Sequence, residues 1–316
     1  MPQARGTAIL LIMRVAVTGG TGFIGQALIR ILRERGDSVI ALSRDIFRAK
    51  EILGDGVELV HWEAGGRPGP WEGELSRSDA VVNLAGEGIF KKRWDTGYKS
   101  RIWRSRVDGT RQLIAAIARQ TQRPRILINA SAIGFYGSQG GEPTDENGSP
   151  GTDFLAQMVQ AWEAEAEKTG PLGLRVVWLR IGVVLDKDGG ALAQMLPPFK
   201  MFLGGWAGNG TQYFSWIHRQ DLVRIMLHVL DHDHLRGAVN ATAPQALTNK
   251  DFSIALGRAL HRPVWAPVPA FVLKLLLGEA AYVILTGQNV LPKVITAAGY
   301  RFVHPDLGEA LESILH

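Results

Sequence analysis

Short apolar runs alternate with longer amphipathic stretches from residue 14 to about residue 185. The apolar runs are predicted as strands, and the stretches between them as helices, of which 94–120 and 153–169 are the clearest. Near-continuous apolar strands that alternate with helices predict an α/β fold, in which a parallel sheet is covered on both faces. The predicted strands cover residues 14–19, 38–43, 57–62, 79–86, 125–132 and 174–185.

The pattern changes after residue 185, which predicts a second, smaller unit beside the sheet. A helix there is expected to be broken at Pro197 and Pro198, and a later helix is expected to begin with Thr248 as its N-cap. We predict an N-terminal extension over residues 1–12, a doubly wound domain over 13–185 plus 218–245, and a smaller, mostly helical lobe over 186–217 plus 246–316.

Composition narrows the possible chemistry and partners. The 316 residues include no cysteine, which excludes disulfides, thiolate catalysis and cysteine-ligated metals and fits a reducing, cytoplasmic compartment. The net charge of +5 is modest, and the basic stretch 91–111 lacks an aromatic platform, so no nucleic-acid partner is expected. The apolar segment 268–287 contains Lys274 and Glu279, which predicts a helical pair and no membrane span.

A glycine turn joins the first predicted strand to the first helix in "VAVTGGTGFIGQAL". Gly19, Gly22 and Gly25 have the spacing G-x-x-G-x-x-G, and this strand-to-helix context is the one that confirms a dinucleotide site. Gly22 would let the backbone approach a pyrophosphate, and Gly25 would let the helix pack against the strand. Free N–H groups at the helix start would then face the phosphates.

The second predicted strand ends at Ser43 and Arg44, where NAD-preferring folds place an acidic residue for the ribose 2′-hydroxyl. A hydroxyl and a guanidinium donate hydrogen bonds, and guanidinium pairs well with phosphate. Asp45, one position later, weakens this argument slightly. The pair predicts NADP(H) as the cofactor, and the tetrapeptide "NLAG" at the end of the fourth strand adds Leu84, Ala85 and Gly86 to the expected adenosine and ribose site.

The motifs "TGGTGFIG", "LSR", "NLAG", "SAIGFYG", "WIH" and "RIGVVL" together resemble the extended short-chain dehydrogenase/reductases. More narrowly, they resemble the atypical branch labelled epimerase family protein, in some members cell-division-inhibitor-like, whose C-terminal module is similar to the tail of this chain. The resemblance implies a Rossmann fold, bound NADP(H) and a substrate that is not settled for the branch. It further implies that the cofactor or substrate contacts Thr21, Phe23, Ile24, Arg101, Arg106, Ala130 and Arg180.

The usual proton donor of that class is missing. Ordinary members use a Tyr four residues before a Lys, and the Tyr transfers a proton as the hydride moves. Here the corresponding positions hold Phe154 and Met158, whose side chains cannot transfer protons. None of the five tyrosines has a lysine four residues later: Tyr98, Tyr136, Tyr213, Tyr282 and Tyr300.

The remaining polar candidates each allow two interpretations. Ser131 at the end of the fifth strand either bonds the substrate or cofactor or merely ends the strand. Tyr136 is either a substitute acid or, as we favour, a packing residue, and His218 is more often structural. Asp221 is expected to cap the following helix, and no metal is expected, since the carboxylates of Asp145–Glu146 are predicted to be solvated. Four apolar residues either line a pocket between the lobes or pack in the core: Met195, Trp206, Phe214 and Trp216.

Two functions therefore remain open from the sequence. The first is an NADP(H)-dependent oxidoreductase or epimerase with a non-standard proton donor, acting on an unknown small molecule. The second is a non-catalytic NADP(H)-binding regulator whose lobes report the cofactor state to a partner protein. The missing Tyr–Lys pair favours the regulator, whereas the retained Ser131 and the full-length second lobe favour the enzyme.

Overall fold

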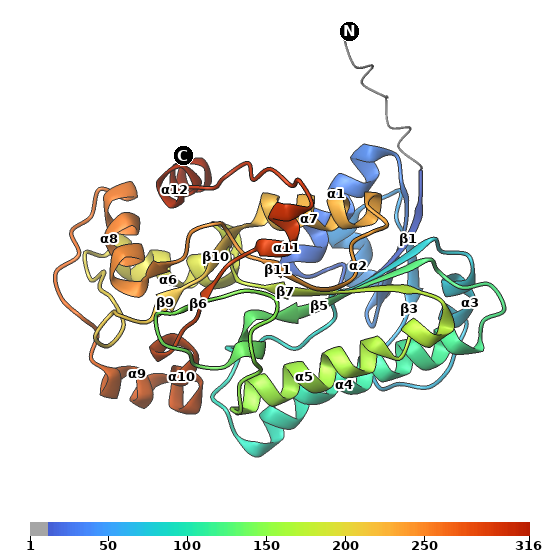
Figure 1. Cartoon of the computed structure of the whole chain (residues 1–316), viewed down its shortest axis with the longest axis horizontal. Helices are drawn as coiled ribbons and strands as arrows, with labels where there is room; N and C mark the ends of the chain where they lie inside the picture. The colour runs from blue at the N-terminus through green and yellow to red at the C-terminus, as the bar shows by residue number, and fades with distance from the viewer. Residues whose placement is uncertain (1–11) are drawn as a thin grey trace, which may run out of the picture.

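The computed structural model describes residues 12–316, which form a seven-stranded parallel sheet with helices on both faces and a smaller lobe beside it (Figure 1). The strand order is β11-β7-β5-β4-β1-β2-β3, so the direction in which strands are added reverses between β1 and β4. This confirms the predicted Rossmann-like fold. The strands are β1 (Arg14–Thr18), β2 (Ser38–Ser43), β3 (Glu58–His61), β4 (Ala80–Asn83), β5 (Ile126–Ala132), β7 (Arg175–Ile181) and β11 (Gly237–Ala241).

The central strands are apolar because both faces of the sheet are covered. On one face, Leu28 of α1 and Val223 of α7 pack on a core that includes Val17. On the other, Leu113 of α4 packs in a second core with Val81 of β4. Burying each such side chain contributes about 1.5–3 kcal/mol. The helices of the two layers are α1 (Phe23–Arg35), α2 (Ile46–Leu53) and α7 (Arg219–Asp231), and opposite them α3 (Trp71–Ser76), α4 (Thr96–Arg119) and α5 (Phe154–Glu167).

The smaller lobe has its own core, in which Leu192, Phe252 and Leu311 are fully buried. Its helices are α6 (Gly190–Lys200), α8 (Asn249–Ala259), α9 (Ala270–Leu277), α10 (Ala281–Leu285) and α12 (Leu307–Leu315), with η3 (Gly278–Ala280) between α9 and α10. Thr248 caps α8 as predicted, because its hydroxyl accepts a hydrogen bond from the Asp251 N–H at 3.1 Å. Three two-stranded sheets complete the lobe and its borders: β8 (Val183–Asp186) with β10 (Trp216–His218), β9 (Tyr213–Phe214) with β12 (Leu247–Thr248), and β6 (Pro143–Thr144) with β13 (Asn289–Val290).

Two predicted element boundaries are wrong. Pro197 and Pro198 do not break α6, which continues to Lys200. Each proline removes one N–H donor, but the N–H groups of Met201 and Leu203 still donate to the carbonyls of Pro197 and Pro198, at 3.1 and 2.9 Å. The strand predicted over 174–185 divides at Gly182 into β7 and β8. A Cβ atom at Gly182 would lie 2.8 Å from the Ser215 carbonyl oxygen, so only glycine allows the chain to leave the large sheet here.

The C-terminal tail returns from the smaller lobe to the large sheet. Ile295 in α11 (Lys293–Ala297) and Tyr300 are buried in the same core as β11, although we predicted that the whole of 246–316 forms the lobe. Asp221 holds this return in place and does not cap α7. Its buried carboxylate accepts hydrogen bonds from the Tyr300 hydroxyl at 2.7 Å and from the N–H groups of Val303 and His304 at 2.8 Å. Among residues 12–316, no helix combines the length and apolar character needed to cross a membrane.

Candidate functional site

The glycine turn between β1 and α1 has no room for a Cβ atom at Gly19 or Gly25. Gly19 has a left-handed backbone with φ of 68°, and a Cβ atom there would lie 2.7 Å from the Leu84 carbonyl carbon. A Cβ atom at Gly25 would lie 2.7 Å from the Gly20 Cα and would also overlap the Gly19 carbonyl oxygen. At Gly22 the nearest atom would be that same oxygen, at 3.1 Å. The turn is therefore a bare backbone surface of the kind that approaches a pyrophosphate.

The N-terminus of α1 is free to bind an anion. Its N-cap residue Gly22 supplies no side-chain hydrogen bond, so the first N–H groups of the 13-residue helix have no side-chain partner at the cap. Such groups and the helix dipole favour negative charge. Phe23 and Ile24 begin this helix, and the Phe23 ring packs against Gly189 and Gly190 with the Arg219 guanidinium 4.9 Å from its centroid. The Thr21 carbonyl accepts a hydrogen bond from the Gln26 side chain at 2.8 Å.

The end of β2 presents cationic and hydroxyl donors. Arg44 is exposed and forms no hydrogen bond or ion pair with any other residue in the described range 12–316. Ser43 is half-buried, and its hydroxyl donates to the Asp45 carbonyl at 3.1 Å. The Asp45 carboxylate caps α2 by accepting a hydrogen bond from the Arg48 N–H at 3.0 Å. Asp45 therefore has a structural role as the N-cap of α2, and the donors that remain at the end of β2 are Ser43 and Arg44.

A buried polar network fixes the floor of the site at the ends of β1, β4 and β5. Thr18 donates to the Asn83 side-chain oxygen at 2.6 Å, and Asn83 donates to Asn129 at 2.6 Å and to Thr110 at 2.8 Å. The N–H groups of Leu84 and Ala85 both donate to the Thr18 hydroxyl, at 3.1 and 3.2 Å. These hydrogen bonds hold the backbone of Leu84 and Ala85 directly against Gly19. The Ala130 carbonyl accepts a hydrogen bond from Asn129 at 2.8 Å.

The two arginines predicted on α4 have different environments. Arg106 packs against Gly86, where a Cβ atom would lie 3.0 Å from the guanidinium carbon, and it donates to the Glu87 carbonyl at 2.9 Å. Burial lowers the pKa of Arg106 to about 10, with Glu87 acting in the opposite direction, so the side chain stays charged at neutral pH. Arg101 is exposed, and its guanidinium lies 5.1 Å from the Tyr98 ring centroid. Only Arg106 is thus in contact with the "NLAG" segment.

Arg180 is buried in a pair with Glu163, a residue that the sequence analysis did not identify. Nε and Nη2 of Arg180 donate to the two carboxylate oxygens of Glu163, each at 2.9 Å. The Ser131 hydroxyl donates to the same carboxylate at 2.5 Å. Burial opposes the charge on Arg180, but the hydrogen bonds and charge of Glu163 outweigh it and raise the pKa of Arg180. The charge of Arg180 is therefore neutralised inside the protein.

Glu163 had one detectable signal in the sequence. It lies on the apolar face of α5, at helical spacing from Val159 and Ala166, both of which are buried. Charged side chains are rarely buried unless they are paired. An acid on an apolar helix face therefore predicts a buried cation, and Arg180 within an apolar strand predicts a buried acid. The pairing itself joins residues 17 positions apart on different elements, which pattern reasoning does not reveal.

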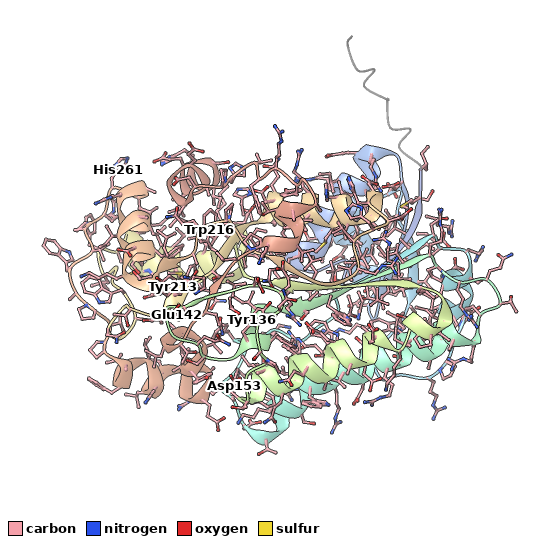
Figure 2. All side chains as sticks on the ribbon, viewed as in Figure 1. Tyr136, Glu142, Asp153, Tyr213, Trp216 and His261 are labelled. Atoms are coloured by element: carbon pink, nitrogen blue, oxygen red, sulfur yellow. The ribbon has the colours of Figure 1, made fainter. Side chains whose placement is uncertain are left out.

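Tyr136 is enclosed by the same network. Its hydroxyl donates to the Asn240 side-chain oxygen at 2.8 Å and accepts from Arg180 at 3.0 Å. Burial raises the pKa of Tyr136, although the nearby Arg180 lowers it in part. The residue is 1% exposed and lies in the middle of the molecule (Figure 2). This environment favours the packing role over that of a substitute acid.

Glu146 also departs from the prediction of a solvated acid. One carboxylate oxygen accepts hydrogen bonds from the N–H groups of Asn240 at 3.0 Å and Val294 at 3.1 Å. The other oxygen is buried and has no partner among the described residues. The neighbouring Asp145 pairs with Lys293 at 3.0 Å. Glu146 thus joins the tail to the edge of the sheet. Within residues 12–316, no three His, Asp or Glu side chains form a group that could hold a metal ion.

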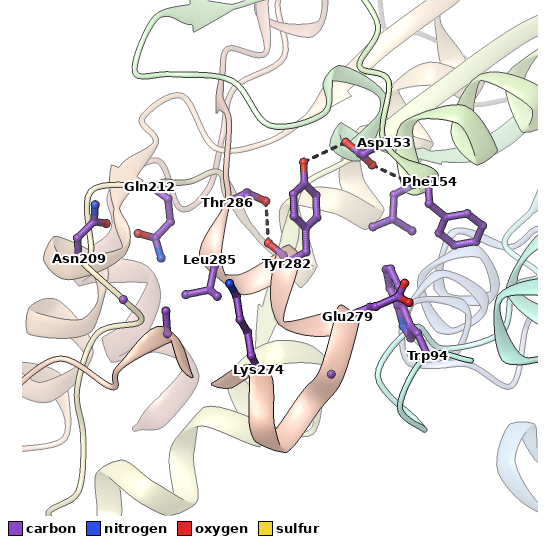
Figure 3. Close-up of a pocket in the computed structure, with 14 residues that line it drawn as sticks. Trp94, Asp153, Phe154, Asn209, Gln212, Lys274, Glu279, Tyr282, Leu285 and Thr286 are labelled. Carbon is purple, nitrogen blue, oxygen red and sulfur yellow. Dashed lines mark hydrogen bonds between the residues drawn. The ribbon is translucent and has the colours of Figure 1, made fainter. Parts of the chain in front are cut away.

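A cleft of about 870 Å³ lies between the start of α5 and the smaller lobe (Figure 3). Phe154 is in its wall, with the Trp94 ring 5.6 Å away in an edge-to-face arrangement, whereas Met158 is buried in the core behind it. The four residues considered for a pocket do not line this cleft; Trp216, for example, is 1% exposed in the lobe core. The cleft is lined by Trp94, Asp153, Phe154, Leu155, Gly208, Asn209, Gln212, Ala270, Lys274, Gly278, Glu279, Tyr282, Leu285 and Thr286.

His218 is structural. Its Nδ1 accepts a hydrogen bond from the Gln220 N–H at 3.0 Å and thereby caps α7, and its ring stacks on that of His304 with centroids 3.9 Å apart. Burial and, to a lesser extent, the neighbouring His304 together lower the pKa of His218 to about 4. The imidazole is therefore neutral at physiological pH.

The fold and the glycine turn define a dinucleotide-binding protein of the Rossmann class. Comparison of the chain with known protein families and structures narrows this class. Residues 15–241 match the NAD dependent epimerase/dehydratase family, and residues 268–314 match a domain of unknown function, DUF1731. The chain therefore belongs to the NAD dependent epimerase/dehydratase family. The predicted resemblance to the epimerase family proteins is confirmed by the relatives described next.

Relatives match over nearly the whole chain. It is 41% identical to "Epimerase family protein SDR39U1 homolog, chloroplastic" of Arabidopsis thaliana, covering 96% of this chain and 87% of the relative. It is 38% identical to Epimerase family protein YfhF of Bacillus subtilis (strain 168), covering 96% and 98%. The crystal structure of human epimerase family protein SDR39U1 (isoform 2) with NADPH is 37% identical, with a TM-score of 0.84, and the match covers 96% of this chain and 99% of that chain.

Proposed function

We propose that this protein binds NADP(H) and acts as an oxidoreductase or epimerase on a small molecule held in the cleft. The observation that carries the proposal is the end of β2, where the Arg44 side chain has no partner among residues 12–316 and the Asp45 carboxylate is used to cap α2. The similar human protein was crystallised with NADPH, which supports the same cofactor. When bound, this cofactor would supply a hydride, and the chain would hold it by the glycine turn and the backbone of Leu84 and Ala85.

The cleft supports a reaction on a small molecule. It adjoins the first turn of α5, the element that carries the proton donor in ordinary members of the class, and its volume suits a small ligand. Its walls combine aromatic rings with the amides of Asn209 and Gln212 and the ammonium group of Lys274 (Figure 3). We place the protein in the cytoplasm, because a chain without cysteine suits a reducing compartment.

A non-catalytic NADP(H)-binding regulator is the second candidate, and one observation favours it. The Ser131 hydroxyl, which could otherwise face a substrate, donates to the buried Glu163 carboxylate and is 3% exposed. Together with Phe154, this leaves the usual catalytic positions without an available hydroxyl group. A partner protein would then have to recognise the cofactor-loaded state.

Replacing Arg44 tests the cofactor assignment. We expect NADPH to raise the melting temperature more than NADH at equal concentration, because a ligand that binds only the folded state stabilises it by mass action. Arg44→Asp should remove or reverse this difference, since a carboxylate repels a 2′-phosphate. Arg301→Asp, which makes the same charge change at another exposed arginine, should keep it. Equal stabilisation of the unmodified protein by NADPH and NADH would contradict the proposal.

Turnover separates the enzyme from the regulator. The purified protein with NADPH is mixed with a panel of ketones, aldehydes and quinones, and the loss of absorbance of the reduced cofactor is followed. Oxidation of NADPH that depends on one of these compounds supports the enzyme. Tight NADPH binding without turnover of any panel member supports the regulator.

A further inference from the structure

Tyr282 is the one tyrosine, among the five in the chain, whose side chain lines the cleft. Tyr98, Tyr136 and Tyr300 are buried, and their hydroxyl groups donate to Gly88, Asn240 and Asp221. Tyr213 is half-buried on β9 and does not line the cleft. Tyr282, in α10, is 39% exposed and belongs to the C-terminal segment, which lies far in sequence from the usual catalytic positions.

The hydroxyl group of Tyr282 lies beside the place where the usual donor is lost. It donates to Oδ2 of Asp153 at 3.3 Å (Figure 3), and Asp153 directly precedes Phe154, which occupies the tyrosine position of the class. The other carboxylate oxygen, Oδ1, accepts hydrogen bonds from the N–H groups of Leu155 and Ala156, at 2.9 and 3.1 Å. Asp153 is thus fixed as the N-cap of α5 and holds the phenol at the first turn of that helix.

From this arrangement we propose that Tyr282 is the proton donor of the reaction, positioned by Asp153. This inference rests on the proposed enzymatic function. In a reduction, bound NADPH would supply a hydride to the substrate carbonyl carbon and become NADP⁺. The carbonyl oxygen would take the Tyr282 proton as the C=O double bond becomes a C–O single bond, and the tyrosinate would regain a proton from water. In the opposite direction the Tyr282 phenolate would accept the hydroxyl proton, and NADP⁺ would take the hydride.

The charge environment suits a donor that remains protonated. Burial and the Asp153 carboxylate both raise the pKa of Tyr282, so the phenol keeps its proton throughout the neutral range. The usual lysine partner would act in the opposite direction, and the Met158 that occupies its position cannot do so. We therefore expect a site that works better as an acid in reduction than as a base in oxidation at neutral pH.

The first experiment removes the hydroxyl group alone. Tyr282→Phe keeps the ring, and we expect it to lower kcat for the best compound of the carbonyl panel about 100-fold. The stabilisation by NADPH should be unchanged, since Tyr282 is not part of the glycine turn. Tyr213→Phe is the matched control in the same lobe and should keep the kcat of the unmodified protein. Full kcat in Tyr282→Phe would overturn the donor role and leave the proposed function standing.

The second experiment needs no turnover. Tyrosine labelled with ¹³C at Cζ gives five resonances, and the one missing in Tyr282→Phe belongs to Tyr282. Asp153→Asn should lower the pH at which this resonance titrates, because the carboxylate that opposes the phenolate is gone, while the asparagine still caps α5. An unchanged titration would overturn the positioning by Asp153. If the unmodified protein binds NADPH but turns over no panel member, the enzymatic function fails, and the donor role fails with it.

Discussion

Single atoms decide whether the turn between β1 and α1 can form. A side chain at Gly25 would overlap the backbone of Gly19 and Gly20. The turn would have to change its conformation to make room for it. Gly20 is constrained in a different way, because a Cβ atom there would lie 2.7 Å from the end of the Ile29 side chain. A flexible side chain can shift, whereas the backbone of a tight turn cannot shift without changing the site.

We expect Gly25→Ala to destabilise the protein by about 1–3 kcal/mol and to abolish the stabilisation by NADPH. Gly73→Ala is the matched control, because Gly73 lies within α3 and a Cβ atom there would have no neighbour within 4 Å. It should be neutral or slightly stabilising. Thermal unfolding with and without NADPH measures both effects. A Gly25→Ala variant that keeps its response to NADPH would show that the turn does not hold the cofactor.

Local sequence predicts the parts of the site that a few consecutive residues build. The glycine turn, Ser43, Arg44 and "NLAG" could be placed because each lies at the end of an apolar strand, and parallel strands end at the same edge of a sheet. Glu163 and Tyr282 could not be placed in the same way. Their partners Arg180 and Asp153 are 17 and 129 residues away in sequence, and such contacts exist only once the chain has folded.

At the scale of elements, the N-cap of α7 is not the residue that helix-capping propensity predicts. His218, which has no special propensity for capping, accepts the hydrogen bond from the Gln220 N–H. Asp221, which has that propensity, is used for the tail. Propensity assigned the cap to Asp221, but in the folded chain its buried carboxylate accepts from three donors of the tail instead.

The cap of α7 makes the stability of the protein depend on pH. Because the pKa of His218 is about 4 in the fold and 6.5 ordinarily, the unfolded chain takes up a proton first as the pH falls. The contribution of neutral His218 to the unfolding free energy is fully present above pH 6.5 and is lost as the pH falls from 6.5 to 4. The total loss is at most about 3 kcal/mol. The groups around the ring are His304, Asp221, Asp186 and Arg219.

His218→Asn should therefore flatten the dependence of the unfolding free energy on pH, since asparagine caps a helix and does not titrate in this range. Urea denaturation at several pH values between 7 and 4 measures it. His261→Asn is the control, because His261 is exposed and has a φ of 53°, which asparagine tolerates. It should keep the pH dependence of the unmodified protein. Parallel pH curves for His218→Asn and the unmodified chain would contradict the role of His218.

At the scale of the whole molecule, the C-terminal segment closes the structure twice. Its strand β13 pairs with β6, and the side chain of Asn240 in β11 donates to the Leu291 carbonyl at 2.9 Å. The segment then crosses to the smaller lobe, where Leu311 of α12 is fully buried against α8. The two lobes therefore share one stretch of chain that completes the packing of both.

Truncation tests this closure. A chain that ends at Gly287 leaves Asn240, Thr242 and Ser215 without their partners in the tail, and it should lose cooperative thermal unfolding and its near-ultraviolet circular dichroism. A chain that lacks only residues 305–316 keeps β13 and α11, and should unfold at a lower temperature while still responding to NADPH. A cooperative transition at the original temperature in the shorter chain would show that the tail is dispensable.

Gly182 has a consequence for how a ligand enters. The joint between β7 and β8 is packed against the Ser215 carbonyl and Thr242, and the chain crosses between the lobes again at β10 and β13. Because the chain joins the two lobes at several packed crossings, we expect no wide hinge opening between them. The cleft is bordered by α9 and α10, and no residue of α9 is buried. A small molecule that enters the cleft from this side would meet the exposed side chains of these two helices first.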